Sequence, residues 1–88
     1  MRQDRITIIN KAGLHARAAS RLAELCASFD SEIRIGRDKL VDGKSILSLM
    51  MLAANKGTEL SVTVDGPDEC DALSAIRSLV ANRFDESE

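Results

Sequence analysis

Histidine occurs once in this chain, at position 15, and it is the residue whose chemistry stands out. A single histidine cannot form a histidine cluster around a metal ion, so no metal site is expected. The sequence also nominates no partner nucleophile and orienting acid for a hydrolase of the Ser-His or Cys-His type. The imidazole itself is therefore the candidate nucleophile.

The position of His15 indicates which group it could accept. A helix is expected to begin at Ala16, yet no Ser, Thr, Asp or Asn lies at its cap position. Its first backbone amides, those of Ala16, Arg17 and Ala18, could therefore bind an anion at the positive end of the helix dipole. The Arg17 guanidinium adds donors that match phosphate oxygens, and the same positive end favours the neutral imidazole. This arrangement predicts a histidine that accepts a phosphoryl group.

A plainer interpretation of the same residues stays open. His15 could simply end a loop and cap the helix, and Arg17 could be a solvated surface charge. The spacing of the two residues alone does not separate these readings.

A second helix is expected from Ser45, as its N-cap, to about Asn55, with Gly57 in the left-handed position that ends it. Apolar residues surround most of this helix. The inward side is expected to hold Ile46, Leu49, Met50 and Ala53. Leu47 and Met51 then face outward and form an exposed apolar patch of the kind that binds proteins. The alternative is a helix that sinks deeper and buries nearly all of these side chains.

The partner-binding surface is accordingly assigned to Leu47, Ser48 and Met51, with Arg21 on the first helix. Ser45 is also a candidate kinase substrate. A phosphate there would add a charge of about −2 beside the patch, and this charge could repel an acidic partner.

The remaining pattern predicts an α+β fold. Alternating apolar residues predict strands at 5–9, 32–35, 40–42 and 60–64, and amphipathic stripes predict helices from 16, from 45 and from 67. The order β-α-β-β-α-β-α packs as two layers, with three helices on one face of a four-stranded antiparallel sheet. The terminal residues 85–88 are expected to fray.

Composition bounds the class of protein. The 88 residues suit one domain, 1–88, and carry 12 Lys and Arg against 14 Asp and Glu. No basic field would attract nucleic acid, and Arg34 and Arg37 are too few to make a basic face. No signal peptide or membrane-spanning run is present, so a cytoplasmic location without membrane insertion is expected. Cys26 and Cys70 are both expected to be buried thiols.

Four segments resemble the HPr family, the histidine-containing phosphocarriers of the bacterial phosphoenolpyruvate-dependent sugar phosphotransferase system. They are Asn10–Arg17, Phe29–Ile33, Gly43–Ile46 and Ala54–Gly57. The resemblance implies an open-faced β-sandwich with sheet order 1-4-2-3. It also implies that His15 is phosphorylated on Nδ1, that Arg17 assists the transfer, and that Ser45 matches a serine at which some bacteria regulate HPr with an ATP-dependent kinase.

The resemblance further implies a covalent carrier that is not itself an enzyme and needs no cofactor. Enzyme I would be its phosphoryl donor, IIA proteins its acceptors, and an HPr kinase/phosphorylase a further partner of what is expected to be a monomer. A second reading, similar to the nitrogen-type branch of the family, is a regulatory module whose phosphorylation state controls partner proteins without sugar transport.

Two features depart from the family pattern. Ala18 stands where many members have proline, which costs some rigidity but keeps good helix propensity, so phosphotransfer is expected to survive. Near Ser45, the pair Asp42 and Gly43 replaces a more usual small or polar pair, and the preceding hairpin is one residue shorter.

Overall fold

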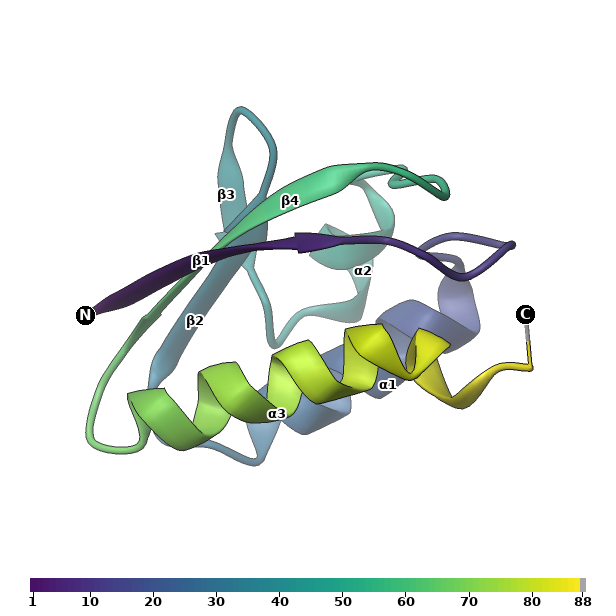
Figure 1. The fold of residues 1–88 in the computed structure, drawn as a ribbon. Coiled ribbons are helices and arrows are strands. Elements are labelled where there is room, and N and C mark those ends of the chain that lie inside the picture. The colour runs from purple at the N-terminus through teal and green to yellow at the C-terminus, as the bar shows by residue number, and fades with distance from the viewer. Residues whose placement is uncertain (88) are drawn as a thin grey trace.

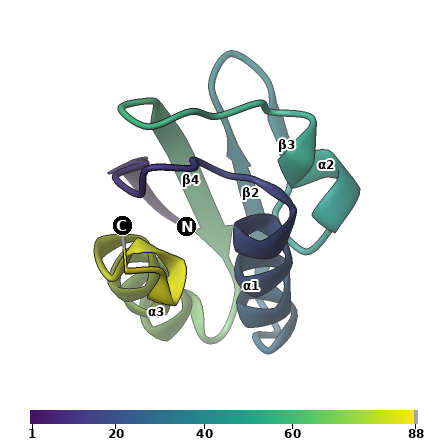
Figure 2. The same cartoon turned by 90° about the vertical axis from the view of Figure 1, so that its right-hand side faces the viewer.

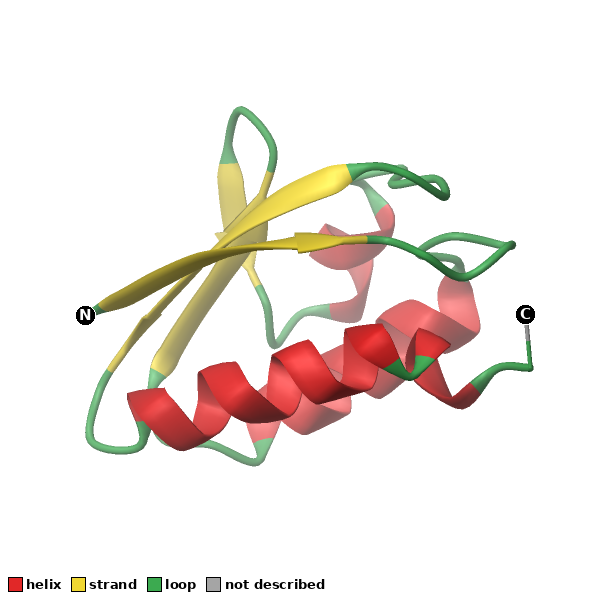
Figure 3. Ribbon diagram, in the orientation of Figure 1, coloured by secondary structure: helices red, strands yellow, loops and turns green. Residues whose placement is uncertain are grey.

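The computed structural model describes residues 1–87 and confirms the expected class and order of elements. Its elements are β1 (Arg2–Thr7), α1 (Ala16–Ala27), β2 (Glu32–Gly36), β3 (Leu40–Asp42), α2 (Ile46–Met50), β4 (Glu59–Asp65), α3 (Glu69–Ala81) and a 3-10 turn at Arg83–Asp85. The strands form one antiparallel sheet in the order β1-β4-β2-β3. The helices lie on one side of this sheet (Figures 1 and 3).

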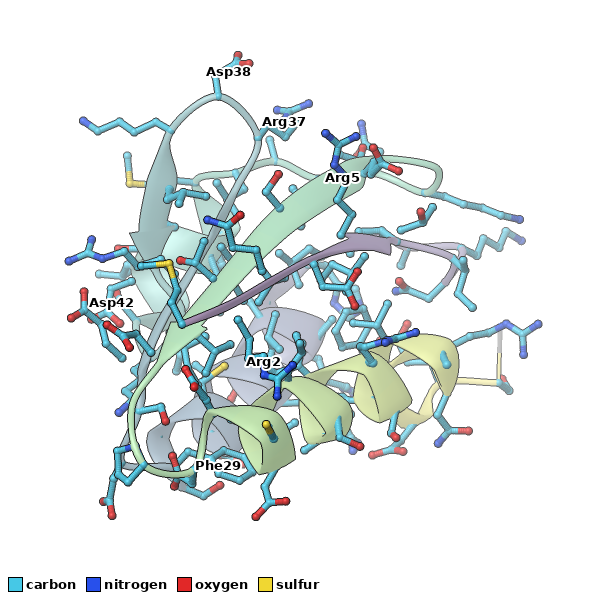
Figure 4. The ribbon with its side chains drawn as sticks, turned by 60° about the vertical axis from the view of Figure 1, so that its left-hand side comes forward. Arg2, Arg5, Phe29, Arg37, Asp38 and Asp42 are labelled. Carbon is cyan, nitrogen blue, oxygen red and sulfur yellow. The ribbon has the colours of Figure 1, made fainter. Side chains whose placement is uncertain are left out.

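The sheet buries one face and leaves the other open. On β4, Leu60, Val62 and Val64 are fully buried and alternate with more polar, less buried residues, as the sequence predicts. Arg37 and Asp38 stand at the tip of the β2–β3 hairpin. Arg2 lies at the other end of the molecule, on the covered side, where it lines a pocket with residues of α3 (Figure 4).

The first strand begins earlier than the sequence predicts, at Arg2 rather than Arg5, and ends at Thr7. Its polar start has little strand preference of its own. The segment forms a strand because it pairs with β4. The pairing runs from Arg2 opposite Val64 to Thr7 opposite Glu59, so the whole segment has backbone hydrogen-bonding partners.

Small residues let the two long helices approach the sheet closely. The buried side of α1 holds Ala18, Ala19, Leu22, Ala23 and Cys26, and that of α3 holds Ala72, Ile76 and Val80. The expectation for cysteine is confirmed for Cys26 and wrong for Cys70, which is exposed on the outer side of α3. Burial raises the pKa of the Cys26 thiol to about 12, so this thiol is unreactive.

Helix α2 is capped as expected but is shorter. The Ser45 hydroxyl accepts a hydrogen bond from the Ser48 amide (3.2 Å). The helix ends at Met50 rather than near Asn55, and the left-handed residue that follows it is Ala53 (φ 50°), while Gly57 belongs to the turn before β4. The Arg37 guanidinium donates to the carbonyl of Leu52 (2.9 Å), which helps to fix this early end.

Asp68 ties two loops together instead of capping α3. Its carboxylate makes no cap bond to that helix but accepts from the amides of Asp30 and Ser31, at 2.9 Å each, and from the Ser31 hydroxyl. These hydrogen bonds hold the pKa of Asp68 below its usual value. The connection before β2 is therefore fastened to the connection before α3.

The expectation that residues 85–88 fray is wrong for Asp85 and Glu86. Phe84 is fully buried, Asp85 accepts a hydrogen bond from Arg21 (3.1 Å), and Glu86 bonds to the loop before α1. Glu88 lies outside the described residues. Figures 1 and 2 both show the C-terminus at the same end of the molecule as the start of α1.

Candidate functional site

His15 lies at the start of α1 with its ring partly open to solvent. It is the N-cap residue, in an extended conformation (φ −81°, ψ −178°), and its side chain is 37% exposed. Its Nδ1 accepts a long hydrogen bond of 3.3 Å from the Arg17 amide. The ring is therefore accessible, and the lone pair of Nδ1 points at the N-terminus of the helix.

The first amides of α1 are largely uncommitted. The first helical hydrogen bond runs from the Ala19 amide to the His15 carbonyl (2.8 Å). Among residues 1–87, the amides of Ala16 and Ala18 donate to no acceptor, and that of Arg17 donates only to Nδ1. His15 thus does cap its helix, as the plainer interpretation holds. The cap uses the Nδ1 lone pair, which is also the lone pair that would attack phosphorus. The capping interpretation and the phosphoryl-acceptor interpretation are therefore compatible with the same geometry.

A carboxylate holds the other side of the ring. Nε2 of His15 lies 2.5 Å from Oε2 of Glu86, and Oε1 of Glu86 accepts from the Nδ2 amide of Asn10 (2.9 Å). Because Nδ1 acts as an acceptor, the hydrogen-bond network assigns the proton of the neutral ring to Nε2, which donates to Glu86. The Asn10 hydrogen bond, followed by that from His15 and the charge of Arg17, lowers the pKa of Glu86.

Two residues of this site, Glu86 and Asn10, were missed in the sequence. Glu86 is 71 positions from His15, and the charged tail around it resembles an ordinary solvated terminus. Asn10 precedes a glycine by three residues and resembles an ordinary turn residue in sequence, although it is fully buried and its Nδ2 also donates to the Gly13 carbonyl (2.7 Å). A polar residue inside a motif next to the candidate nucleophile was the only available signal.

The loop that carries His15 is fixed against the segment after α2. The Leu14 amide donates to the carbonyl of Ala54 (2.8 Å). Gly13 adopts a left-handed conformation (φ 72°), and a Cβ there would come within 2.6 Å of that same carbonyl oxygen. Only glycine therefore fits at position 13 without moving the residues that place the ring.

The two arginines of α1 differ in their contacts. Within the described chain, the exposed Arg17 guanidinium makes no hydrogen bond or ion pair, so its donors face solvent beside His15. Arg21 donates to Asp85 of the C-terminal turn. The structure therefore connects Arg21 with the C-terminal segment, and within residues 1–87 its side chain makes no hydrogen bond or ion pair with α2.

The apolar patch of α2 is exposed and wider than the sequence predicts. Leu47 and Met51 are 74% and 84% exposed, while Ser48 is half-buried. The expected inward set is correct only for Leu49, because Ile46, Met50 and Ala53 are also exposed. A helix of five residues is too short to bury a second row of side chains. We call Ile46, Leu47, Met50 and Met51 the α2 patch.

Neither a metal site nor a membrane-spanning helix occurs in the part of the chain that the structure describes. Residues 1–87 contain no group of three His, Cys, Asp or Glu side chains placed to hold a metal ion. None of their helices has the length and apolar character needed to cross a bilayer.

Comparison with known proteins gives one consistent result. Residues 2–82 match the family described as "PTS HPr component phosphorylation site". The chain is 51% identical over 85 residues to a phosphocarrier protein HPr of Pseudomonas aeruginosa, covering 94% of each chain. It is 48% identical over 89 residues to a phosphocarrier protein HPr of Cupriavidus necator, covering all of both. The crystal structure of HPr-C-His from Thermoanaerobacter tengcongensis matches all of both chains with a TM-score of 0.95 at 35% identity.

Proposed function

The chain belongs to the HPr family of phosphotransferase-system phosphocarriers, and on that premise we propose that His15 accepts a phosphoryl group from phosphorylated enzyme I and passes it to IIA proteins. One observation carries the proposal. The Nδ1 lone pair of an accessible, singly protonated imidazole faces the start of α1.

The chemistry follows from that geometry. Phosphoryl transfer passes through a loose, in-line transition state with charge spread over three oxygens, so positioning and charge stabilisation are the main requirements. A phosphoryl group on Nδ1 would replace the contact to the Arg17 amide and come close to the amides of Ala16 and Ala18. Ala18 supplies a backbone N–H that a proline would lack. The Arg17 guanidinium adds two further donors.

The test is direct labelling. Incubation with phosphoenolpyruvate and enzyme I should give one acid-labile phosphate per chain, and His15→Ala should abolish it. Ser45→Ala is the matched control, because it removes a helix cap elsewhere and should keep the label. A phosphate that remains on the His15→Ala protein, folded by circular dichroism, would refute the site.

Partner binding is proposed for the α2 patch with Ser48, and for Arg21 beside the phosphorylated end of α1. The α2 patch supports this, because four exposed apolar side chains on one short helix are unusual on a surface that serves no partner. Residues 1–88 would act as one domain, a monomeric carrier in the cytoplasm, which is consumed and regenerated as a substrate of its partners rather than turning over as an enzyme.

The α2 patch would equally serve a second candidate, a regulatory carrier of the nitrogen type. In that case the phosphorylation state of His15 would control partner proteins through the same surface without sugar transport. A pull-down with phosphorylated and unphosphorylated protein separates the two. Sugar permease components identify the first function, whereas regulators or kinases captured in only one state identify the second.

Regulation at Ser45 is proposed on the same surface. Ser45 is half-buried and lies at the start of α2, immediately before Ile46 of the α2 patch, where its hydroxyl accepts from the Ser48 amide. A phosphate there would keep the cap and place a negative charge at the edge of the α2 patch. ATP and an HPr kinase/phosphorylase should label the wild type and leave Ser45→Ala unlabelled. Absence of label from both proteins would end this idea.

A further inference from the structure

We propose that Glu86 is a positioning residue, which holds the proton on Nε2 of His15 throughout the transfer cycle so that phosphoryl groups arrive at and leave Nδ1 without any proton transfer. This inference rests on the proposed function and assigns a task to the C-terminal segment.

The carboxylate is held rigidly enough for this task. One of its oxygens lies 2.5 Å from Nε2, and the other accepts from the Nδ2 amide of Asn10, which is itself fully buried and bonded to the Gly13 carbonyl. The preceding residues are anchored as well, because Phe84 is fully buried and Asp85 is paired with Arg21. Glu86 is therefore fixed against the same loop that carries the ring.

The bond changes balance with the proton left in place. In the accepting step, the Nδ1 lone pair forms a bond to phosphorus as the bond between phosphorus and the donor atom breaks, and the electron pair of that bond returns to the donor atom. The ring now has phosphorus on Nδ1 and hydrogen on Nε2, and it carries a positive charge beside the Glu86 carboxylate. In the delivering step, a nucleophilic atom of the acceptor forms a bond to phosphorus as the Nδ1–P bond breaks, and the electron pair of that bond returns to Nδ1. The ring is then neutral imidazole again, its original state.

Loss of the Nε2 proton would slow the second step. The leaving group would then be an imidazolate anion, which is a far poorer leaving group than neutral imidazole. A carboxylate hydrogen-bonded to the protonated form favours that form. We therefore expect Glu86 to raise the pKa of the phosphorylated ring and to keep the carrier reactive at neutral pH.

The charges around the ring single out Glu86. Lys11 lines the same open pocket as His15 and Glu86, and Arg17 follows on α1. Both are cations that would oppose a protonated ring. The Asp85 carboxylate on the C-terminal turn is paired with Arg21. In the described part of the chain, Glu86 is thus the one acid in contact with the imidazole, and its lowered pKa keeps it ionised at neutral pH.

The experiment follows the phosphorylated ring by 15N and 31P NMR as pH is raised, in the wild type and in Glu86→Gln. Glutamine keeps a hydrogen-bond acceptor but removes the charge, so the pKa of the phosphohistidine should fall by about one unit, a typical effect of losing an adjacent opposite charge. Transfer to a IIA protein, measured above both pKa values, should then slow about tenfold, and below both it should be unchanged.

Asp85→Asn is the matched control, since it neutralises the neighbouring carboxylate, and it should leave the phosphohistidine pKa at the wild-type value. Glu86→Asp should restore part of the shift. If Glu86→Gln is phosphorylated and titrates like the wild type, or if Asp85→Asn shifts equally, the inference is wrong while the carrier function stands. If the wild type takes up no phosphate at all, the proposed function itself fails.

Discussion

Truncation of Leu47 to alanine should separate partner binding from stability. The substitution removes three carbons from a side chain that is 74% exposed in the free protein. At about 0.8 kcal/mol per buried methylene, a partner that covers the exposed share completely would lose about 1.8 kcal/mol of binding. This energy corresponds to roughly a twentyfold rise in KM.

Leu47→Ala should have only a small effect on the free energy of unfolding. Only about a quarter of the Leu47 side chain is buried in the free protein, so Leu47→Ala should cost about 0.6 kcal/mol of unfolding free energy, a Tm change of a few degrees. Leu49→Ala on the same helix is the contrast, because Leu49 is fully buried and its truncation should cost about 2–5 kcal/mol.

The assay measures the initial rate of phosphoryl transfer from enzyme I, and to a IIA protein, against carrier concentration. Leu47→Ala should raise KM and leave kcat unchanged, because the substitution does not touch His15. Leu40→Ala is the matched control, a leucine truncated on the open face of the sheet. Wild-type KM values for Leu47→Ala with both partners would refute the assignment of the α2 patch as a docking surface.

Three further substitutions test the local structure through thermal or chemical unfolding. Ala53→Gly should stabilise the protein by about 0.5–1 kcal/mol, because Ala53 is exposed and left-handed (φ 50°); an unchanged or lower Tm would contradict that strain. Ser45→Ala should cost about 1 kcal/mol through loss of the α2 cap, and an unchanged Tm would show that the cap is not needed. Asp68→Asn tests pH dependence. The pKa of Asp68 is lowered in the folded state, so its stabilisation exists above the unfolded pKa and is lost as pH falls through the folded one. The wild type should therefore be more stable than Asp68→Asn at neutral pH. The difference should begin to shrink as pH falls below about 4, the unfolded pKa, and should vanish only below the lower pKa of the folded state. A constant difference would exclude the ionised carboxylate as its source.

Most of the fold could be predicted because local patterns and tertiary packing agree. The alternation of Leu60, Val62 and Val64 predicts the central strand, and the cap at Ser45 predicts the start of α2. Where tertiary contacts decide, sequence patterns fail. The polar start of β1 is a strand because β4 pairs with it, and α2 stops at Met50 although apolar residues continue.

In the candidate site, too, local residues could be predicted from the sequence and residues brought in by tertiary packing could not. His15, Arg17 and the helix start are neighbours in sequence, so their chemistry could be predicted from spacing. Glu86 and Asn10 meet the ring through a hydrogen-bond chain that joins the two ends of the protein. Such a chain depends on where the C-terminal segment packs, and that in turn depends on burial of Phe84. The sequence of the C-terminal segment has no periodic pattern from which this packing could be predicted.

The proposed mechanism depends most on which nitrogen of the His15 ring carries the phosphoryl group. A 15N–31P correlation spectrum of the phosphorylated protein measures this directly. The structure predicts coupling of phosphorus to Nδ1, the nitrogen that faces the start of α1, with hydrogen retained on Nε2. Coupling to Nε2 would contradict the account, because that nitrogen is occupied by Glu86 and faces away from the helix amides.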